Sequence, residues 1–321
     1  MASPTEATFA LDVGDVPAPD HSAHPQGFVV EVEPGERVHF LDWGAPDLPP
    51  GAPRPAGALL VHGLSQTAWT WTPVARRMAG RMHVVAMDLR GHGLSDSPAT
   101  GYAPATLAED VVAVAEGSGL LAEAGDGIIL AGHGFGAIVA AWAAARLGGR
   151  VRGLLLVDGG WQDLARVSGV DPDEFLRSLD EPPEVLRSMG AYLADRRDFD
   201  PATWDADQEQ AARATVVEQV SGRLTPAMRP HALARSVEAM FAYDPLAVLP
   251  SIGVPIIAFA AADDDDGSAT AGLRDVQERL AAVGRPPIRV ARFPDAGHNL
   301  MRYRPEAVCA AILDLTSTIE P

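Results

Sequence analysis

Residues 128–141, with the sequence IILAGHGFGAIVAA, decide the fold of this 321-residue chain. A short apolar run enters a glycine-rich turn, and an alanine-rich run that favours helix leaves it. This order is typical of a buried parallel strand that turns sharply into a helix. The turn has the spacing Gly-x-Gly-x-Gly, and its central residue, Gly134, has no side chain that can act as a nucleophile.

The same alternation of strand and helix extends in both directions from this turn. Apolar runs predict further buried strands at residues 58–61, 83–87, 153–158, 254–259 and 288–293. Helix-favouring runs lie between or after them, beginning near residue 72 and covering residues 104–116, 272–283 and 305–318. Because the strands are apolar on both faces, we expect an α/β fold with a mostly parallel, doubly wound sheet covered by helices on both sides.

The pattern divides the chain into three parts. Residues 1–26 are rich in proline and aspartate and are expected to form a flexible arm. The α/β core is expected to comprise residues 27–159 and 245–321, and it begins with a hairpin around the Pro34-Gly35 turn. Residues 160–244 are rich in charge, helix formers and proline and contain no buried strand, so we expect a helical cap over the carboxyl edge of the sheet.

Composition excludes several classes of function. The net charge of −18 chiefly favours solubility, and it repels nucleic acids and anionic membrane surfaces, so we expect neither as a partner. No window is long and apolar enough for a membrane span, and the start of the chain lacks the pattern of a secretory signal. A single cysteine, Cys309, excludes an internal disulfide framework. A cytoplasmic location is therefore expected.

Candidate functional residues follow the ends of the predicted strands, where ligands bind in open α/β sheets. They are His62, Gly63, Leu64, Asp88, Gly134, Asp158, Asp263, Asp264 and His298. No histidine–carboxylate spacing of a metal site is present, and the elbow glycines lack the register of a dinucleotide site. We therefore expect neither a metal nor a cofactor.

Four motifs show a family resemblance: LVHG at residues 60–63, DLRGHGLSD at 88–96, AGHGFG at 131–136 and DAGHNL at 295–300. Together they resemble the α/β-hydrolase superfamily, in the branch with esterases, lactonases, epoxide hydrolases and C–C hydrolases, over residues 28–318. The resemblance implies that Gly134 stands at the position of the nucleophile and that His298 is the general base. It also implies an oxyanion hole made by the backbone amides of Leu64 and Phe135.

The acid that supports His298 is expected just beyond the strand at residues 254–259. By spacing, Asp264 is the best match, Asp263 is second, and Asp158, used in some relatives, is third. His62, Trp69 and Trp71 are candidates for the pocket wall, although burial of the tryptophans in the core is about equally expected.

Glycine at the elbow leaves several functions open. Glycine adopts strained elbow angles at little steric cost, so Gly134 preserves the turn but removes the hydroxyl. Our main hypothesis is a hydrolase that acts on a small, largely apolar ester or lactone through a His/Asp dyad, with water in place of serine. The alternatives are a cofactor-free lyase, cyclase or dioxygenase that uses the dyad as a base, a binding pseudoenzyme, and a serine hydrolase whose serine has been replaced.

Overall fold

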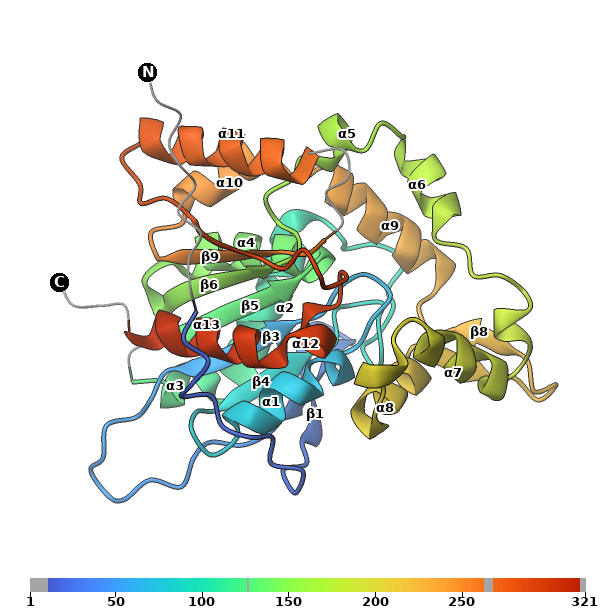
Figure 1. The fold of residues 1–321 in the computed structure, drawn as a ribbon, viewed down its shortest axis with the longest axis horizontal. Helices are drawn as coiled ribbons and strands as arrows, with labels where there is room; N and C mark the ends of the chain where they lie inside the picture. Colours follow the sequence, from blue (N-terminus) through green and yellow to red (C-terminus); the bar gives the residue numbers. More distant parts are fainter. Residues whose placement is uncertain (1–10, 126, 263–267, 318–321) are drawn as a thin grey trace.

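A computed structural model of the chain describes residues 11–125, 127–262 and 268–317. Within this part, eight strands form one sheet in the order β1-β2-β4-β3-β5-β6-β9-β10 (Figure 1). The first two strands are antiparallel to their neighbours and the others are parallel, which confirms the expected mostly parallel sheet. The strands are β1 (Gln26–Glu33), β2 (Glu36–Asp42), β3 (Gly57–Val61), β4 (Val84–Met87), β5 (Ile128–His133), β6 (Val151–Val157), β9 (Ile256–Ala260) and β10 (Arg289–Arg292).

Helices cover both faces of the sheet because alternate strand residues point to opposite sides. In β3, Leu59 and Val61 belong to one hydrophobic core, while Ala58 and Leu60 belong to the other. The first core packs against α2 (Pro104–Gly117), α4 (Phe135–Leu147) and α11 (Ser268–Ala282). The second packs against α1 (Thr72–Met78) and α13 (Pro305–Ser317), which lie together on one face in Figure 1. Three short helices complete the core: α3 (Leu120–Glu123), α10 (Pro245–Val248) and α12 (Leu300–Tyr303).

The turn from β5 to α4 depends on the absence of side chains. A Cβ atom on Gly132 would lie 2.2 Å from the carbonyl oxygen of Gly136, so the strand and the helix approach each other too closely for a larger residue. Gly134 has φ 52° and ψ −115°, a conformation that residues with a Cβ atom rarely adopt. The glycine spacing therefore forms the sharp elbow that the sequence predicts.

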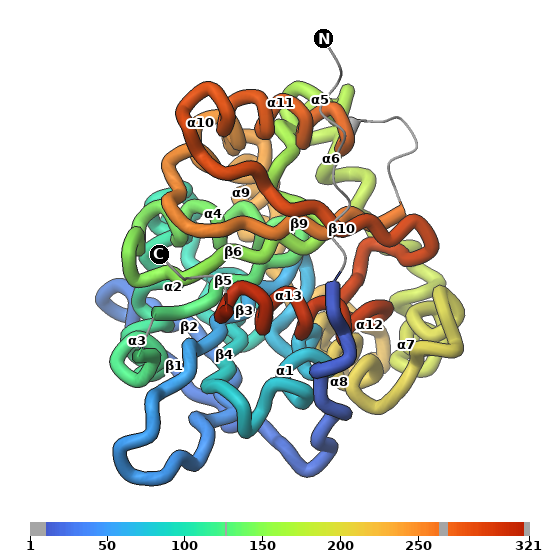
Figure 2. The backbone as a smooth tube through the Cα atoms, turned by 60° about the vertical axis from the view of Figure 1, so that its left-hand side comes forward, coloured from blue at the N-terminus to red at the C-terminus, as the bar shows by residue number. Residues whose placement is uncertain are grey.

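The stretch expected to form a helical cap contains α5 (Leu164–Val167), α6 (Pro172–Ser178), α7 (Met189–Asp198), α8 (Ala206–Ala214) and α9 (Pro230–Phe241). Asp171, Ser188 and Asp205 begin three of these helices, and each side chain accepts a hydrogen bond from a backbone amide of the first turn. A small hairpin of β7 (Val216–Glu218) and β8 (Leu224–Pro226) was not expected, because its strands are too short to show a period. Helices α7 and α8 lie beside α12 (Figures 1 and 2).

Residues 11–25, part of the expected flexible arm, contact α1. The amide of Asp20 donates to the carbonyl oxygen of Arg76 at 3.0 Å, and Arg81 donates to the carbonyl oxygen of Asp15 at 3.0 Å. Leu11 packs against the second core. The composition gave no sign of these contacts, because they depend on a helix that follows some fifty residues later.

A buried ion pair joins the end of β4 to α2. Arg90 donates to both carboxylate oxygens of Asp110 at 2.6 Å, and the two side chains are 2% and 1% exposed. Such bidentate geometry compensates both charges at a place where water cannot solvate them.

None of the described helices is both long and apolar enough to pass through a bilayer.

Candidate active site

A cavity of about 500 Å³ opens at the carboxyl ends of the central strands. We call it the Gly134 cavity. Its wall includes the elbow, the loop after β3 and residues of the insertion, and most of its larger side chains are apolar: Leu64, Phe135, Ile138, Leu164, Phe175, Leu179 and Met240. Asp158 and His298 also line it. The site thus lies where open α/β sheets bind ligands.

His298 and Asp158 form a close pair at this cavity. The Nδ1 atom of His298 lies 2.6 Å from Oδ2 of Asp158, and the amide of Ala261 donates to Oδ1 of the same carboxylate at 2.8 Å. Asp158 directly follows β6, and its φ of 47° is unusual for a residue with a side chain. Since both carboxylate oxygens are engaged, the acid fixes the orientation of the imidazole and leaves its Nε2 atom for chemistry.

The free side of the imidazole faces the elbow. A Cβ atom built on Gly134 would lie 3.2 Å from Nε2 of His298 and 3.5 Å from Cε1. Half of the His298 side chain is exposed to solvent. The place that a side chain at residue 134 would occupy is therefore within reach of the Nε2 atom. Because residue 134 is glycine, this place is open to a small molecule.

Backbone amides lie at the same place. Phe135 is the first residue of α4, and the N–H groups of the first helical turn have no acceptor inside the helix. The N-terminus of a helix also carries a partial positive charge, which favours a developing oxyanion. Leu64 lies in the loop after β3 and lines the same cavity. The structure thus brings the two predicted amide residues to the wall beside Gly134.

His133 supports the loop that carries His298. Its Nε2 atom donates to the backbone carbonyl of His298 at 3.0 Å, and the two rings lie 4.3 Å apart between centroids. Gln66 contacts Nδ1 of His133 at 3.0 Å and donates to the side chain of Asn299 at 2.6 Å. Complete burial, together with the charge that His298 can carry, lowers the pKa of His133 well below its usual value. His133 therefore acts as a structural group that links the elbow to the loop of His298.

The structure treats the other predicted site residues differently. Asp263 and Asp264 lie outside the described residues, while Asp158, ranked third from the sequence, contacts His298. His62 and Trp71 are fully buried, and neither they nor Trp69 belongs to the wall of the cavities described here. Trp71 belongs to the second hydrophobic core and Trp69 packs against it, which is the alternative that the sequence left open for the tryptophans.

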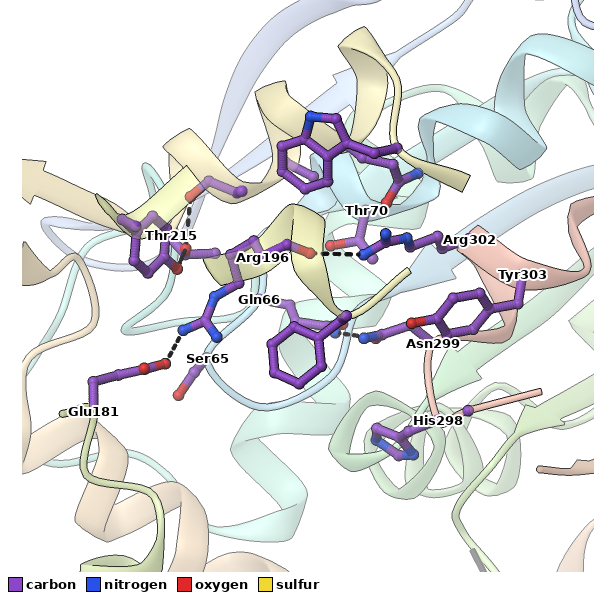
Figure 3. Close-up of a pocket in the computed structure, with 17 residues that line it drawn as sticks. Ser65, Gln66, Thr70, Glu181, Arg196, Thr215, His298, Asn299, Arg302 and Tyr303 are labelled. Carbon is purple, nitrogen blue, oxygen red and sulfur yellow. Dashed lines mark hydrogen bonds and ion pairs between the residues drawn. The ribbon is translucent and has the colours of Figure 1, made fainter. Parts of the chain in front are cut away.

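A second cavity of about 490 Å³ lies between the insertion and α12 (Figure 3). We call it the Arg302 cavity. Figure 3 shows Arg196 and Glu181 joined at one side, and His298, Asn299 and Tyr303 at the other. No sequence pattern pointed to Arg196 or Arg302 as site residues. The only local signal is that Arg302 lies four residues after His298, and nothing in the sequence pairs it with the insertion.

No group of three or more histidine, cysteine or acidic side chains arranged to hold a metal ion occurs among residues 11–125, 127–262 and 268–317. The arrangement of His298, Asp158 and the amides beside Gly134 is suited to activating water and stabilising an oxyanion.

Comparison with known proteins identifies the family of the chain. A family model described as the alpha/beta hydrolase family matches residues 58–311. The chain is 28% identical to a 2-(acetamidomethylene)succinate hydrolase of Mesorhizobium japonicum, over 79% of this chain and 85% of the relative. It is 29% identical to an N-formylmaleamate deformylase of Pseudomonas putida, over 83% and 87% of the two chains.

Solved structures show the same fold. The crystal structure of E-2-(acetamidomethylene)succinate hydrolase matches with a TM-score of 0.68 at 21% identity, over 92% of this chain and all of the other. An enol-lactonase from Burkholderia xenovorans matches with a TM-score of 0.61 at 17% identity, over 90% and 99% of the two chains.

Proposed function

Because the chain belongs to the alpha/beta hydrolase family, we propose that it hydrolyses a small ester or lactone with water in place of a serine nucleophile. The observation that carries this proposal is the distance of 3.2 Å between the Cβ position of Gly134 and Nε2 of His298. A water molecule beside Gly134 would occupy the place of a nucleophilic hydroxyl. It would lie within hydrogen-bond reach of the base.

The proposed reaction begins when Nε2 of His298 accepts a proton from this water. The oxygen of the water attacks the carbonyl carbon, and the carbonyl oxygen becomes an oxyanion between the amides of Leu64 and Phe135. Asp158 holds the neutral tautomer and then stabilises the imidazolium. His298 returns the proton to the leaving oxygen as its bond to carbon breaks, so an acid and an alcohol are released.

The comparisons support small acyl groups as the first substrates to test. One relative is named for an acetamido compound and the other for a formyl compound. The Gly134 cavity, at about 500 Å³ with mostly apolar walls, has room for groups of this size and larger.

The decisive experiment replaces His298 with alanine and measures kcat/KM on acetyl and formyl aryl esters. We expect a loss of ~10²–10⁴-fold, the usual contribution of a positioned general base. His231→Ala is the matched control, because His231 is exposed and its ring forms hydrogen bonds with Ser97, away from the Gly134 cavity. Hydrolysis in ¹⁸O-labelled water should label the acid, and no acyl-enzyme should appear in the intact mass. An unchanged rate in His298→Ala, or a stable acyl-enzyme, would overturn the proposal.

A further inference from the structure

The Gly134 cavity and the Arg302 cavity meet at the imidazole of His298. Both are lined by Ser65, Gln66, Glu181 and His298. Gly134 and the two amide residues line only the first cavity, whereas Asn299 and Arg302 line only the second. The two spaces therefore form two arms of one site, with the base at the junction.

The chemistry of ester hydrolysis assigns a role to each arm. The carbonyl oxygen must lie against the amides beside Gly134, which places the acyl group in the Gly134 cavity. The leaving oxygen must lie near Nε2 of His298, because this atom returns the proton to it. The leaving group then extends along the loop of His298 into the Arg302 cavity.

The two arms differ in charge. Among the described residues on the wall of the Gly134 cavity, the charged side chains apart from His298 are the carboxylates of Asp158 and Glu181. An acyl group without charge fits these walls. The Arg302 cavity instead carries two arginines, Arg196 and Arg302, against the single carboxylate of Glu181. This is a local excess of positive charge in a chain with a net charge of −18.

The two arginines are not equivalent. Arg196 forms ion pairs with Glu181 and with Asp195, the latter at 3.0 Å, so its charge is compensated. Arg302 donates to three neutral oxygens: the hydroxyl of Thr203 at 2.8 Å and the carbonyls of Asp200 at 2.6 Å and Arg196 at 3.3 Å.

No carboxylate within the described ranges forms an ion pair with Arg302. Its guanidinium also lies 5.5 Å from the ring centroid of Trp204 and 5.3 Å from that of Tyr303. These contacts hold the cation at the cavity while leaving it without a direct ion-pair partner among the described residues.

We propose that the Arg302 cavity binds a leaving group that carries a carboxylate. The substrate would then be an ester between a small uncharged acid and a hydroxy acid. This inference rests on the proposed function and adds which side of the ester bond carries the charge. Arg302 is the specificity-determining residue, and Glu181 opposes the anion from the other side of the cavity.

The test compares 4-acetoxybenzoate with methyl 4-acetoxybenzoate, each rate being divided by the rate of its uncatalysed hydrolysis. We expect kcat/KM to favour the carboxylate about tenfold, a modest value for a charge contact open to solvent. Arg302→Gln should bring the ratio close to one. Glu181→Gln should raise it, because the opposing charge is removed. Arg197→Gln, an exposed arginine of α7 that does not line the cavity, should leave the ratio unchanged.

Binding of the leaving group tests the site without turnover. Calorimetry should show that 4-hydroxybenzoate binds about tenfold more tightly than its methyl ester, and that salt weakens the difference. Suppose that neither ester is hydrolysed, but that the preference for 4-hydroxybenzoate is lost in Arg302→Gln and increased in Glu181→Gln. The proposed function then fails and the inference stands. If both esters are hydrolysed equally and the two phenols bind equally, the inference is overturned and the proposed function stands. Glu181→Gln keeps the test valid should Arg302→Gln fail to fold.

Discussion

Oδ2 of Asp158 lies 2.6 Å from Nδ1 of His298, although 140 residues separate the two in the chain. The sheet explains this contact. Asp158 directly follows β6, His298 follows β10, and only β9 lies between these two strands. The loops at the carboxyl ends of neighbouring parallel strands converge at one edge, so the acid and the base meet there.

Asp158→Asn should lower kcat/KM by ~10²–10⁴-fold, because an amide cannot stabilise the imidazolium and favours the wrong tautomer. Asp198→Asn is the control, since this aspartate is 71% exposed and does not line the Gly134 cavity. Steady-state kinetics on the same esters measure both variants. Full activity in Asp158→Asn would return the role of the acid to Asp264 or Asp263, which Asp264→Asn would then test.

Gly134→Ser and Gly134→Ala form a matched pair. Both introduce a Cβ atom at φ 52°, and we expect each to cost ~1–3 kcal/mol of stability. Both also require His298 to move by a few tenths of an ångström, which its half-exposed side chain permits. The variants therefore differ only in the hydroxyl.

Alanine should abolish hydrolysis, because its methyl group excludes the proposed water. Serine should restore it through an acyl-enzyme that intact mass spectrometry detects during turnover. Normal activity in Gly134→Ala would show that no water beside this residue takes part in the reaction.

Asp110→Asn should destabilise the fold by ~3–5 kcal/mol, because it leaves the buried charge of Arg90 without its bidentate partner. Urea denaturation followed by circular dichroism gives the free energy of unfolding. Glu109→Gln, on the same helix, removes the partner of Arg146 in a pair that is half exposed, so its cost should stay below ~1 kcal/mol. If the two variants lost the same free energy of unfolding, burial would not be the reason why the Arg90–Asp110 pair matters for stability.

Acid should destabilise the protein partly through His92. Burial, with a contribution from His62, lowers the pKa of His92 to about 3, whereas an unfolded histidine titrates near ~6.5. Between these values the unfolded chain binds the extra proton, so the free energy of unfolding falls as pH falls, by ~1.4 kcal/mol per pH unit for this residue.

In His92→Asn the free energy of unfolding should therefore change less steeply with pH in this window. Denaturant titrations at pH 4, 5 and 6 measure this slope. The exposed His24→Asn should not change the slope. An identical slope in His92→Asn and the unaltered protein would show that His92 titrates normally.

The sequence by itself determined the mostly parallel sheet, the elbow and the absence of a hydroxyl at Gly134. These features depend on local apolar periodicity and on glycine spacing, which are written in short stretches. It also placed His298 after the last strand, because the motif around residue 298 is contiguous.

Only the tertiary structure decided which described carboxylate meets His298. Spacing along the chain favoured Asp264, but strand order brings Asp158 into contact. The tertiary structure also places Trp71 in the core, and it places Arg302 against the insertion at a cavity beside His298. Such contacts join segments far apart in sequence, and they depend on how helices pack rather than on any local pattern.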